Sequence, residues 1–397
     1  MFDNMLDFIP ASMLAQLTPA MDQRKYSQDQ LVNLVLSGSL VQAFAPCIVH
    51  KHCRSVCRAA RAFIHCAGPP CVDWSTQNTR GERGQFGPTF LVTLTWCAQR
   101  LLIKEPVLLH ENILAFDLEV LIACLGAVYC LFPGELDVAS LGWPVHRRRR
   151  LTLCIRKDLM QTVHYPWHVF LRNCCRVTTA CWLEFTHHTH EIHIQETLDW
   201  MRSRPTSMYN MSRRQRKAAI RDECEEWGAN MKAVLRAADQ SPFTHALLAS
   251  ECRRLVEYRR LANASEHGCK YLCCLLGQEP GPHAQYSTSP VLNTIIRKTV
   301  IAWADPVLRP LTGFELMSAQ GFVTHPSCSL GGVLSSSFLL NRSRHRAAVG
   351  EQAGNSMPVN FVGLALMWVA AAIDIREPMS LDPMLAKVVS LHKRGRS

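Results

Sequence analysis

The feature that most constrains the fold is an alternation of strand-like and helix-like runs between about residues 61 and 157. The strand-like runs are AFIHC (62–66), EPVLLHENI (105–113) and RLTLCI (150–155). Helical spacing marks FGPTFLVTLTWCAQRLLI (86–103) and DLEVLIACLGAVYCLF (117–132). Such alternation is typical of βαβ units, whose helices cover a partly parallel sheet. The sequence therefore predicts an α/β fold for this part of the chain.

The rest of the chain is organised differently. Residues 160–290 mix His, Arg, Cys and Ser without the alternation, and they predict a second, irregular domain with a helical centre at 212–239. Residues 332–350 have the composition of a loop or linker. The longest apolar run, 359–373, has 15 residues, whereas about 20 are needed to span a bilayer. This run predicts a buried helix in a soluble protein.

The net charge and the cysteine content indicate the kind of partner and the compartment of the protein. The net charge of +11 indicates a polyanionic partner, with nucleic acid as the first candidate. The first ten residues carry acidic and no basic side chains, so no secretory signal is expected. We therefore expect the 18 cysteines to lie in a reducing compartment, as core residues, metal ligands or nucleophiles.

The stretch FIHCAGPPCVDWS (63–75) contains a candidate nucleophile, Cys71. A turn between a strand end and a helix exposes a thiolate to oriented backbone N–H groups. The prolines at 69 and 70 fix the backbone of this turn and donate no N–H. The alternative interpretation is a buried structural cysteine, which is common for free cysteine.

Glu111 follows the apolar run PVLL and precedes Asn112. A carboxylate at the C-terminal end of a strand in an open α/β sheet points into the crevice where ligands bind. A partly desolvated glutamate there can hold or donate a proton near neutral pH. The alternative interpretation is a helix N-cap or a surface acid.

Four consecutive arginines enter a strand in GWPVHRRRRLTLCI (142–155). Alternate residues of a strand face the same side, so Arg147 and Arg149 share one face, and Arg148 and Arg150 share the other. One pair can face the crevice and hold a phosphate or a base edge, because guanidinium presents a bidentate fork. The alternatives are a solvated basic run and a nuclear-import patch.

In their order along the chain, these blocks resemble the cytosine carbon-5 methyltransferase family. The sequence has G-x-P-C-x-x-x-S, then E-N-I some forty residues later, then G-x-P-x-x-R-x-R before a strand. RPLTGFELMSAQGFVTHP (309–326) and GNSMPVNFVGLAL (354–366) resemble two later family blocks, and SPVLNTIIRKTVIAW (289–303) resembles the stretch that closes its variable domain. The resemblance covers roughly residues 61–157 and 288–375.

The resemblance implies roles for the candidate residues. Cys71 would attack carbon 6 of a cytosine, and Glu111 would contact ring nitrogen 3 and the exocyclic amine. Arg149, supported by Arg147, would orient the base or its covalent adduct. Carbon 5 would then accept a methyl group from S-adenosylmethionine. Because a base inside a duplex is out of reach, the target cytosine would be flipped out of the helix.

The resemblance also implies an architecture and further contacts. It implies a Rossmann-like methyltransferase domain over residues 1–157, a smaller target-recognition domain over 158–334, and a segment, 335–397, that returns to the first domain. The residues implied to contact the cofactor are Pro70, Asn355 and Ser356. The residues implied to support the catalytic loops or the substrate are Ser75, Asn112, Gln320 and Gly321, with Phe322 beside them.

The chain departs from the family pattern in its N-terminal region. The family opens with a strand and a D-x-F-x-G-x-G-G loop that cradles the methyl donor, where glycine lets the backbone approach the ligand. The corresponding residues 1–19 contain no glycine, and no acidic residue marks a second strand end for the ribose. Val145 replaces the family's usual Gln, and Phe314 replaces its usual Arg, whereas Glu315 is kept. The chain is thus either an incomplete enzyme or one that has lost cofactor binding.

These patterns favour a DNA cytosine-5 methyltransferase that uses S-adenosylmethionine, in the nucleus if the source is eukaryotic and otherwise in the cytoplasm. The partner would be DNA, with RNA as an alternative, and no membrane. Two other functions stay open: a tRNA cytosine-5 methyltransferase, and a nucleic-acid-binding relative that cannot hold the methyl donor.

Two Cys/His-rich stretches raise the question of a metal. CIVHKHCRSVC (47–57) with Cys66 lacks a recognised zinc-finger spacing, and THHTHEIHI (186–194) is typical of a solvated loop. No metal is therefore expected. The runs SRRQRK (212–217) and HKRGRS (392–397) are typical of phosphate contacts or nuclear import.

Overall fold

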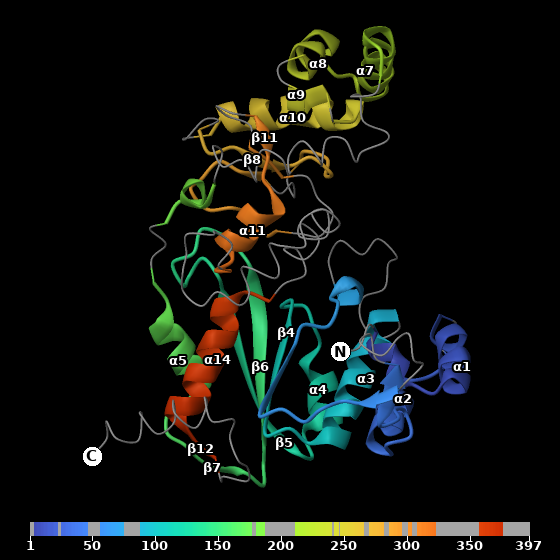
Figure 1. Cartoon of the computed structure of the whole chain (residues 1–397). Coiled ribbons are helices and arrows are strands. Elements are labelled where there is room, and N and C mark those ends of the chain that lie inside the picture. The colour runs from blue at the N-terminus through green and yellow to red at the C-terminus, as the bar shows by residue number, and fades with distance from the viewer. Residues whose placement is uncertain are drawn as a thin grey trace. The chain divides into compact units, whose positions relative to one another are not determined.

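The computed structural model of the chain (Figure 1) divides into two compact units. The first consists of Met1–Leu136, Arg148–Cys174 and Phe361–Ser397, and the second of Asp137–Arg147 and Cys175–Asn360. The structure describes residues 4–22, 25–46, 56–74, 88–176, 180–186, 211–239, 242–245, 247–265, 270–281, 286–295, 301–303, 308–322 and 357–375.

The first unit is built on a mixed four-stranded sheet with the strand order β3-β4-β6-β5. Strand β3 (Ile64–Ala67) pairs in parallel with β4 (Val107–Asn112), and β4 pairs antiparallel with β6 (Arg148–Arg156). Strand β5 (Tyr129–Asp137) completes the sheet beside β6. All six residues of β4 are buried, as expected of a central strand covered on both faces. The predicted α/β fold is confirmed.

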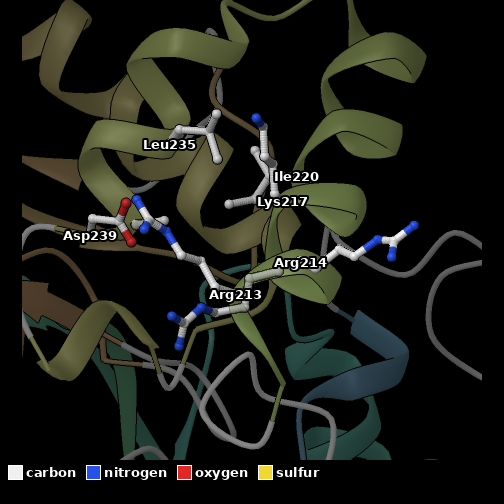
Figure 2. Close-up of a pocket in the computed structure, with 8 residues that line it drawn as sticks. Arg213, Arg214, Lys217, Ile220, Leu235 and Asp239 are labelled. Atoms are coloured by element: carbon white, nitrogen blue, oxygen red, sulfur yellow. The ribbon is translucent and has the colours of Figure 1, made fainter.

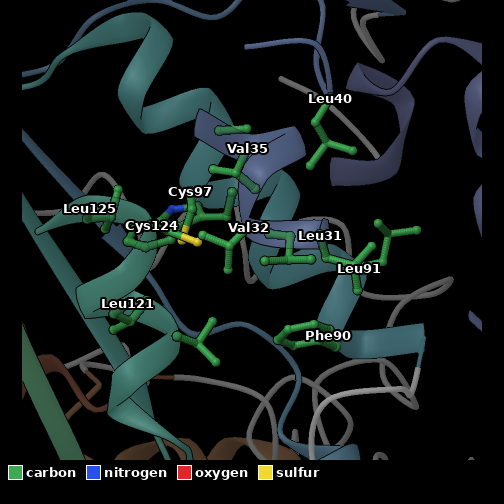
Figure 3. Close-up of a cluster of buried hydrophobic side chains, with 14 of the residues drawn as sticks. Leu31, Val32, Val35, Leu40, Phe90, Leu91, Cys97, Leu121, Cys124 and Leu125 are labelled. Atoms are coloured by element: carbon green, nitrogen blue, oxygen red, sulfur yellow. The ribbon is translucent and has the colours of Figure 1, made fainter. Parts of the chain in front are cut away.

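Helices α3 (Pro88–Ile103) and α4 (Leu118–Leu125) connect the strands, and the N-terminal helices α1 (Ala11–Asp22) and α2 (Gln28–Leu36) follow η1 (Met5–Phe8). Helix α2 begins with a capping box between Ser27 and Gln30. Side chains of α2, α3 and α4 form the main apolar core of this unit (Figure 3).

The helix predicted over residues 117–132 is shorter than expected. Helix α4 ends at Leu125, with Gly126 as its C-cap, and β5 begins at Tyr129. An aromatic residue, Tyr129, is well suited to a half-buried strand, and glycine weakens a helix. The prediction was wrong because one apolar stretch contains both a helix and a strand.

The apolar run near the C-terminus forms α14 (Val359–Ala372), as predicted. One side is buried through residues such as Phe361 and Trp368, whereas Met367 on the other side is 58% exposed. The indole N–H of Trp368 donates to the Tyr165 carbonyl at 2.7 Å. Strand β12 (Ile373–Ile375) then pairs with β7 (Met160–Val163), and α5 (Trp167–Cys174) follows β7 in the chain. No described helix is long and apolar enough to cross a membrane.

The second unit combines helices with a small sheet. Its helices are η4 (Trp182–Phe185), α7 (Arg213–Trp227), α8 (Met231–Ala238), α9 (Pro242–His245), α10 (Ala249–Asn263) and α11 (Gly313–Ala319). Its strands are β8 (Cys273–Leu275), β9 (Tyr286–Ser287), β10 (Ile301–Trp303) and β11 (Arg309–Pro310), in the order β11-β10-β8-β9. The predicted helical centre at 212–239 is two helices, because Gly228 adopts a left-handed conformation with φ of 61° between them. The predicted linker at 332–350 lies outside the described residues.

Candidate active site

The turn that carries Cys71 lies directly after β3, and the short helix η3 (Val72–Trp74) follows it. The Trp74 N–H donates to the Cys71 carbonyl at 3.1 Å. A Cβ atom added to Gly68 would lie 2.8 Å from Oε2 of Glu111, which is closer than real Cβ contacts allow. The turn therefore passes so close to the Glu111 carboxylate that a side chain at position 68 would displace it.

Asp73, two residues after Cys71, fixes this turn to a distant helix. Its side chain is only 5% exposed and accepts from the backbone N–H groups of Thr89 at 2.8 Å and Phe90 at 3.1 Å, and from the Thr89 hydroxyl. Asp73 thus caps the N-terminus of α3 from 16 residues away. The neighbouring Trp74 packs edge-on against Phe90 and Phe116.

Glu111 lies near the end of β4 and is buried, with 6% of the residue exposed. Its Oε1 is 2.9 Å from Nε of Arg149 on the neighbouring strand β6. The two side chains are 8% and 12% exposed, respectively. This is a largely buried ion pair, in which each charge depends on the other. The interpretation of Glu111 as a surface acid was wrong.

Asn112 connects the nucleophile turn to β4. Its side-chain N–H donates to the Pro69 carbonyl at 3.4 Å, and its side-chain oxygen accepts from the Ile113 N–H at 2.9 Å. Together with the close approach of Gly68 to Glu111, this bond brings the first two predicted motifs into contact.

The four consecutive arginines follow the strand alternation only in part. Arg149 pairs with Glu111, whereas Arg148 and Arg150 both reach Glu135, at 3.0 and 3.4 Å. Arg147 belongs to the second unit, where its backbone N–H donates to Asp137 at 2.7 Å and its Nη1 donates to the Ile295 carbonyl at 3.3 Å. Arg147 precedes β6 and is buried by contacts of its own unit. The alternation of side chains along β6 therefore does not determine the direction of its side chain.

The other predicted site residues lie elsewhere. Pro70 is exposed at the turn, and Ser75, Asn355 and Ser356 are outside the described residues. Gln320 is the C-cap of α11 in the second unit and is fully buried, and Gly321 follows it with a φ of 88°.

Near these residues Phe322 donates its N–H to the Met317 carbonyl at 3.2 Å. Glu315, the acidic residue kept from the family block, pairs with Arg309 at 2.6 Å and forms a capping box with Thr312. This block of the sequence therefore builds and fixes α11.

Burial shifts the pKa values of two histidines and three thiols of the first unit toward their neutral forms. His110, fully buried between the rings of Trp96 and Phe116, has its pKa lowered to about 3 by desolvation. Burial, with a smaller effect from Arg100, lowers the pKa of His65 to about 4. Burial also raises the pKa values of the Cys66, Cys97 and Cys154 thiols, which makes them poor nucleophiles at neutral pH.

The described N-terminal residues do not form a cradle for S-adenosylmethionine. They form η1, α1 and α2, which pack on α3 and α4. The hairpin of β1 (Phe44–Pro46) and β2 (Val56–Arg58) is a separate sheet, and β3 has only β4 as a partner among the described strands. The described residues therefore do not fit the methyl donor, because no strand followed by a glycine turn lies beside β3.

Metal binding can be assessed only for the residues that the structure describes. Among the described residues, no group of three or more His, Cys, Asp or Glu side chains is placed to hold a metal ion. Residues 47–55 and 187–194 of the two Cys/His-rich stretches lie outside the described part of the chain.

Comparison with known proteins gave structural likenesses only. No protein-family model and no curated protein matches the chain. The Schizosaccharomyces pombe Dnmt2 methyltransferase is similar with 11% identity and a TM-score of 0.40, over 77% of this chain and 78% of that one. The Entamoeba histolytica methyltransferase EhMeth has 11% identity and a TM-score of 0.38, over 77% and 75%. A Spodoptera frugiperda DNMT2 mutant has 13% identity and a TM-score of 0.34, over 77% and 78%.

Proposed function

We propose that the first unit carries the active site of a nucleic-acid cytosine carbon-5 methyltransferase, with DNA as the substrate. The observation that carries this proposal is the contact between the Cys71 turn and the buried Glu111–Arg149 pair. The turn that carries the nucleophile follows the C-terminal end of β3, and the buried carboxylate, paired with a guanidinium of β6, lies near the C-terminal end of the parallel strand β4. Ligands bind at this edge in open α/β sheets.

The proposed chemistry begins with activation of the base. The Cys71 thiolate forms a bond to carbon 6, the electron pair of the carbon 5–carbon 6 double bond moves between carbons 4 and 5, and the electron pair of the carbon 4–nitrogen 3 double bond moves onto nitrogen 3, which takes a proton carried by Glu111. Glu111 holds the proton at ring nitrogen 3 and accepts from the exocyclic amine, while Arg149 fixes the orientation of the carboxylate. The result is an electron-rich carbon 5. S-adenosylmethionine is the donor that the family resemblance implies, but the described residues account for base activation alone.

The domain organisation that the family resemblance implies suggests how a substrate is held. Residues 1–157 would perform the chemistry, 158–334 would recognise the target, and 335–397 would return to the first domain. The net charge of +11 favours a nucleic-acid partner. A nuclear location in a eukaryote follows from DNA as the substrate, and tRNA is the alternative substrate of the same chemistry.

One observation favours a second candidate function. Because the described N-terminal residues are helical and residues 1–19 lack glycine, the chain fits a relative that binds nucleic acid and engages a cytosine but delivers no methyl group. The two candidates share Cys71, Glu111 and Arg149, and they differ only in donor binding.

Covalent trapping tests the shared chemistry without the methyl donor. In 5-azacytosine the ring atom at position 5 is nitrogen, so attack of the Cys71 thiolate at carbon 6 moves an electron pair to that nitrogen, which takes a proton from water. DNA and tRNA oligonucleotides containing this base should give an adduct that survives denaturing electrophoresis. Cys71→Ser should abolish the adduct, whereas Cys175→Ser, which removes an exposed thiol, should leave it unchanged. An adduct that persists in Cys71→Ser would refute the proposed site.

Donor binding separates the two candidates. Titration calorimetry of the full chain with S-adenosylmethionine should give a saturable heat if the protein is a methyltransferase. Trapping without any heat at millimolar donor would establish the second candidate and exclude the first for this chain.

A further inference from the structure

A cavity of about 510 Å³ lies between α7 and α8 in the second unit. Four of its lining residues are cationic and come from the first turns of α7: Arg213, Arg214, Arg216 and Lys217, here called the α7 basic cluster. Figure 2 shows Ile220 of α7 and Leu235 of α8 beside these cations, with Asp239 at the end of α8. The cavity thus combines charged walls with a small apolar surface.

Within the described part of the chain no ion pair of 4 Å or less joins these cations to an acidic side chain, although Asp239 lines the same cavity. By contrast, Arg221 on the same helix pairs with Asp222 and Glu225, and Arg260 on α10 pairs with Glu257 at 2.6 Å. Asp239 lies within 3.9 Å of His245. The positive charge of the cluster is therefore available to a ligand.

The position of the cluster is unfavourable for the helix itself. The N-terminus of a helix carries partial positive charge, so cations there are destabilising, and anions near the C-terminus are destabilising too. Helix α7 has its cations in the first turns and Asp222, Glu223, Glu225 and Glu226 in its second half. Helix stability does not explain this arrangement, which points to a binding function.

The cluster is held on a rigid support. Ile220 and Cys224 of α7 and Val234 of α8 are buried in the core of the second unit together with residues of α10. A capping box, in which the Gln215 N–H donates to the Ser212 hydroxyl and the Ser212 N–H donates to the Gln215 side chain, fixes the start of α7.

We propose that the α7 basic cluster binds the phosphate backbone of a nucleic-acid strand. Guanidinium groups bind phosphate oxygens in a bidentate fashion, and Lys217 adds a point charge. The apolar surface of Ile220 and Leu235 can contact the sugar or base beside the bound phosphate. This contact is independent of sequence and independent of the chemistry proposed for Cys71.

Salt-dependent binding of unmodified DNA tests this proposal. The probe is a fluorescein-labelled 20-base-pair duplex without 5-azacytosine, and fluorescence anisotropy of the full chain is measured between low and moderate salt. Replacing all four cations of the cluster by Gln should weaken binding at least tenfold. The slope of log affinity against log salt should become shallower by about 0.9 for each phosphate that the variant no longer neutralises.

Paired variants provide the control. Arg213→Gln with Arg214→Gln should weaken binding severalfold, whereas Arg221→Gln with Arg260→Gln removes the same charge from paired residues and should change binding less than twofold. Glutamine preserves helix propensity, and circular dichroism checks that α7 is retained. Equal losses in the two double variants, an unchanged salt slope, or equally effective competition by polyglutamate would overturn the proposal. Since the duplex lacks the trapping base, these outcomes are separate from those of the covalent test.

Discussion

Two basic runs of similar composition have opposite environments in this protein. The arginines at 148–150 enter strand β6, where Arg149 pairs with buried Glu111 and the other two reach Glu135. The α7 basic cluster lies in the first turns of a helix and makes no ion pair within 4 Å among the described residues, although Asp239 lines the same cavity. The same residue types therefore serve as part of a fixed, charge-compensated site in one unit and as an uncompensated surface in the other.

The difference follows from secondary structure. A strand directs neighbouring side chains to opposite faces, and the adjacent strands β4 and β5 supply a carboxylate for each face. In the first turn of α7, by contrast, Arg213 and Arg214 are exposed. Removing the charge of Glu111 or Arg149 therefore leaves the other residue buried without its counter-charge. Removing a cation of the α7 basic cluster leaves no such partner behind.

The largest effect is therefore expected at Glu111. Glu111→Gln leaves the Arg149 guanidinium buried without its counter-charge, and breaking such a pair costs about 3 kcal/mol of unfolding free energy. Denaturant titration measures this loss. Glu135→Gln is the matched control, because its side chain is 43% exposed and surface pairs contribute about 0–1 kcal/mol. A double variant, Glu111→Gln with Arg149→Gln, should be less destabilised than the sum of its singles. Additive losses would show that the pair is not coupled.

Acid pH should weaken the first unit through His110. The pKa of this side chain is about 3 in the folded protein and 6.5 in its unperturbed form, so below pH 6.5 the unfolded chain binds a proton that the folded chain excludes. Stability should fall as pH decreases from about 6.5 toward 3, with a slope of up to about 1.4 kcal/mol per pH unit. His110→Phe should flatten this slope, because phenylalanine cannot be protonated and still packs against Trp96 and Phe116. Denaturant midpoints at pH 7, 6 and 5 provide the measurement, and an unchanged slope in the variant would contradict the assignment.

Asp73 should link stability to reactivity. Asp73→Ala removes an N-cap and should cost about 1 kcal/mol of unfolding free energy, and it should also slow adduct formation at Cys71 because the turn loses its anchor on α3. Asp117→Ala removes the N-cap of α4 and should cost a similar amount while adduct formation stays at the wild-type rate. The ratio of trapping rates in these two variants separates a positioning role from a general loss of stability. Equal trapping rates would assign Asp73 to stability alone.

Much of the first unit could be predicted from local patterns. The apolar runs that became β3, β4 and β6 were visible in the sequence, and so were Cys71, Glu111 and Arg149 at the ends of these elements. The division of one apolar stretch into α4 and β5 was missed, because apolar residues satisfy helical and strand patterns equally well and only Gly126 marks the change.

Contacts between distant segments could not be predicted from the sequence. Asp73 gave no local signal, since its partners Thr89 and Phe90 are 16 and 17 residues away. Strand alternation predicted that Arg147 and Arg149 face the same side of the sheet. Strand β6 begins only at Arg148, and Arg147 instead donates to the carbonyl of Ile295, which is 148 residues away. The catalytic roles of Cys71, Glu111 and Arg149, and the supporting role of Arg147, stay predictions.

The smallest expected effect has the opposite sign and completes the comparison of the two basic runs. Arg213→Gln with Arg214→Gln removes two cations from the N-terminus of α7, where they oppose the helix dipole, so the unfolding free energy should rise by about 0.3–1 kcal/mol. Arg149→Gln should instead lower it, because Glu111 would be left buried without its partner. Thermal unfolding at low and high salt measures both, and salt should reduce the gain at α7 while hardly changing the loss at Arg149. A loss of stability in the α7 variant would mean that these cations support the fold, and it would remove the main reason to regard them as a binding surface.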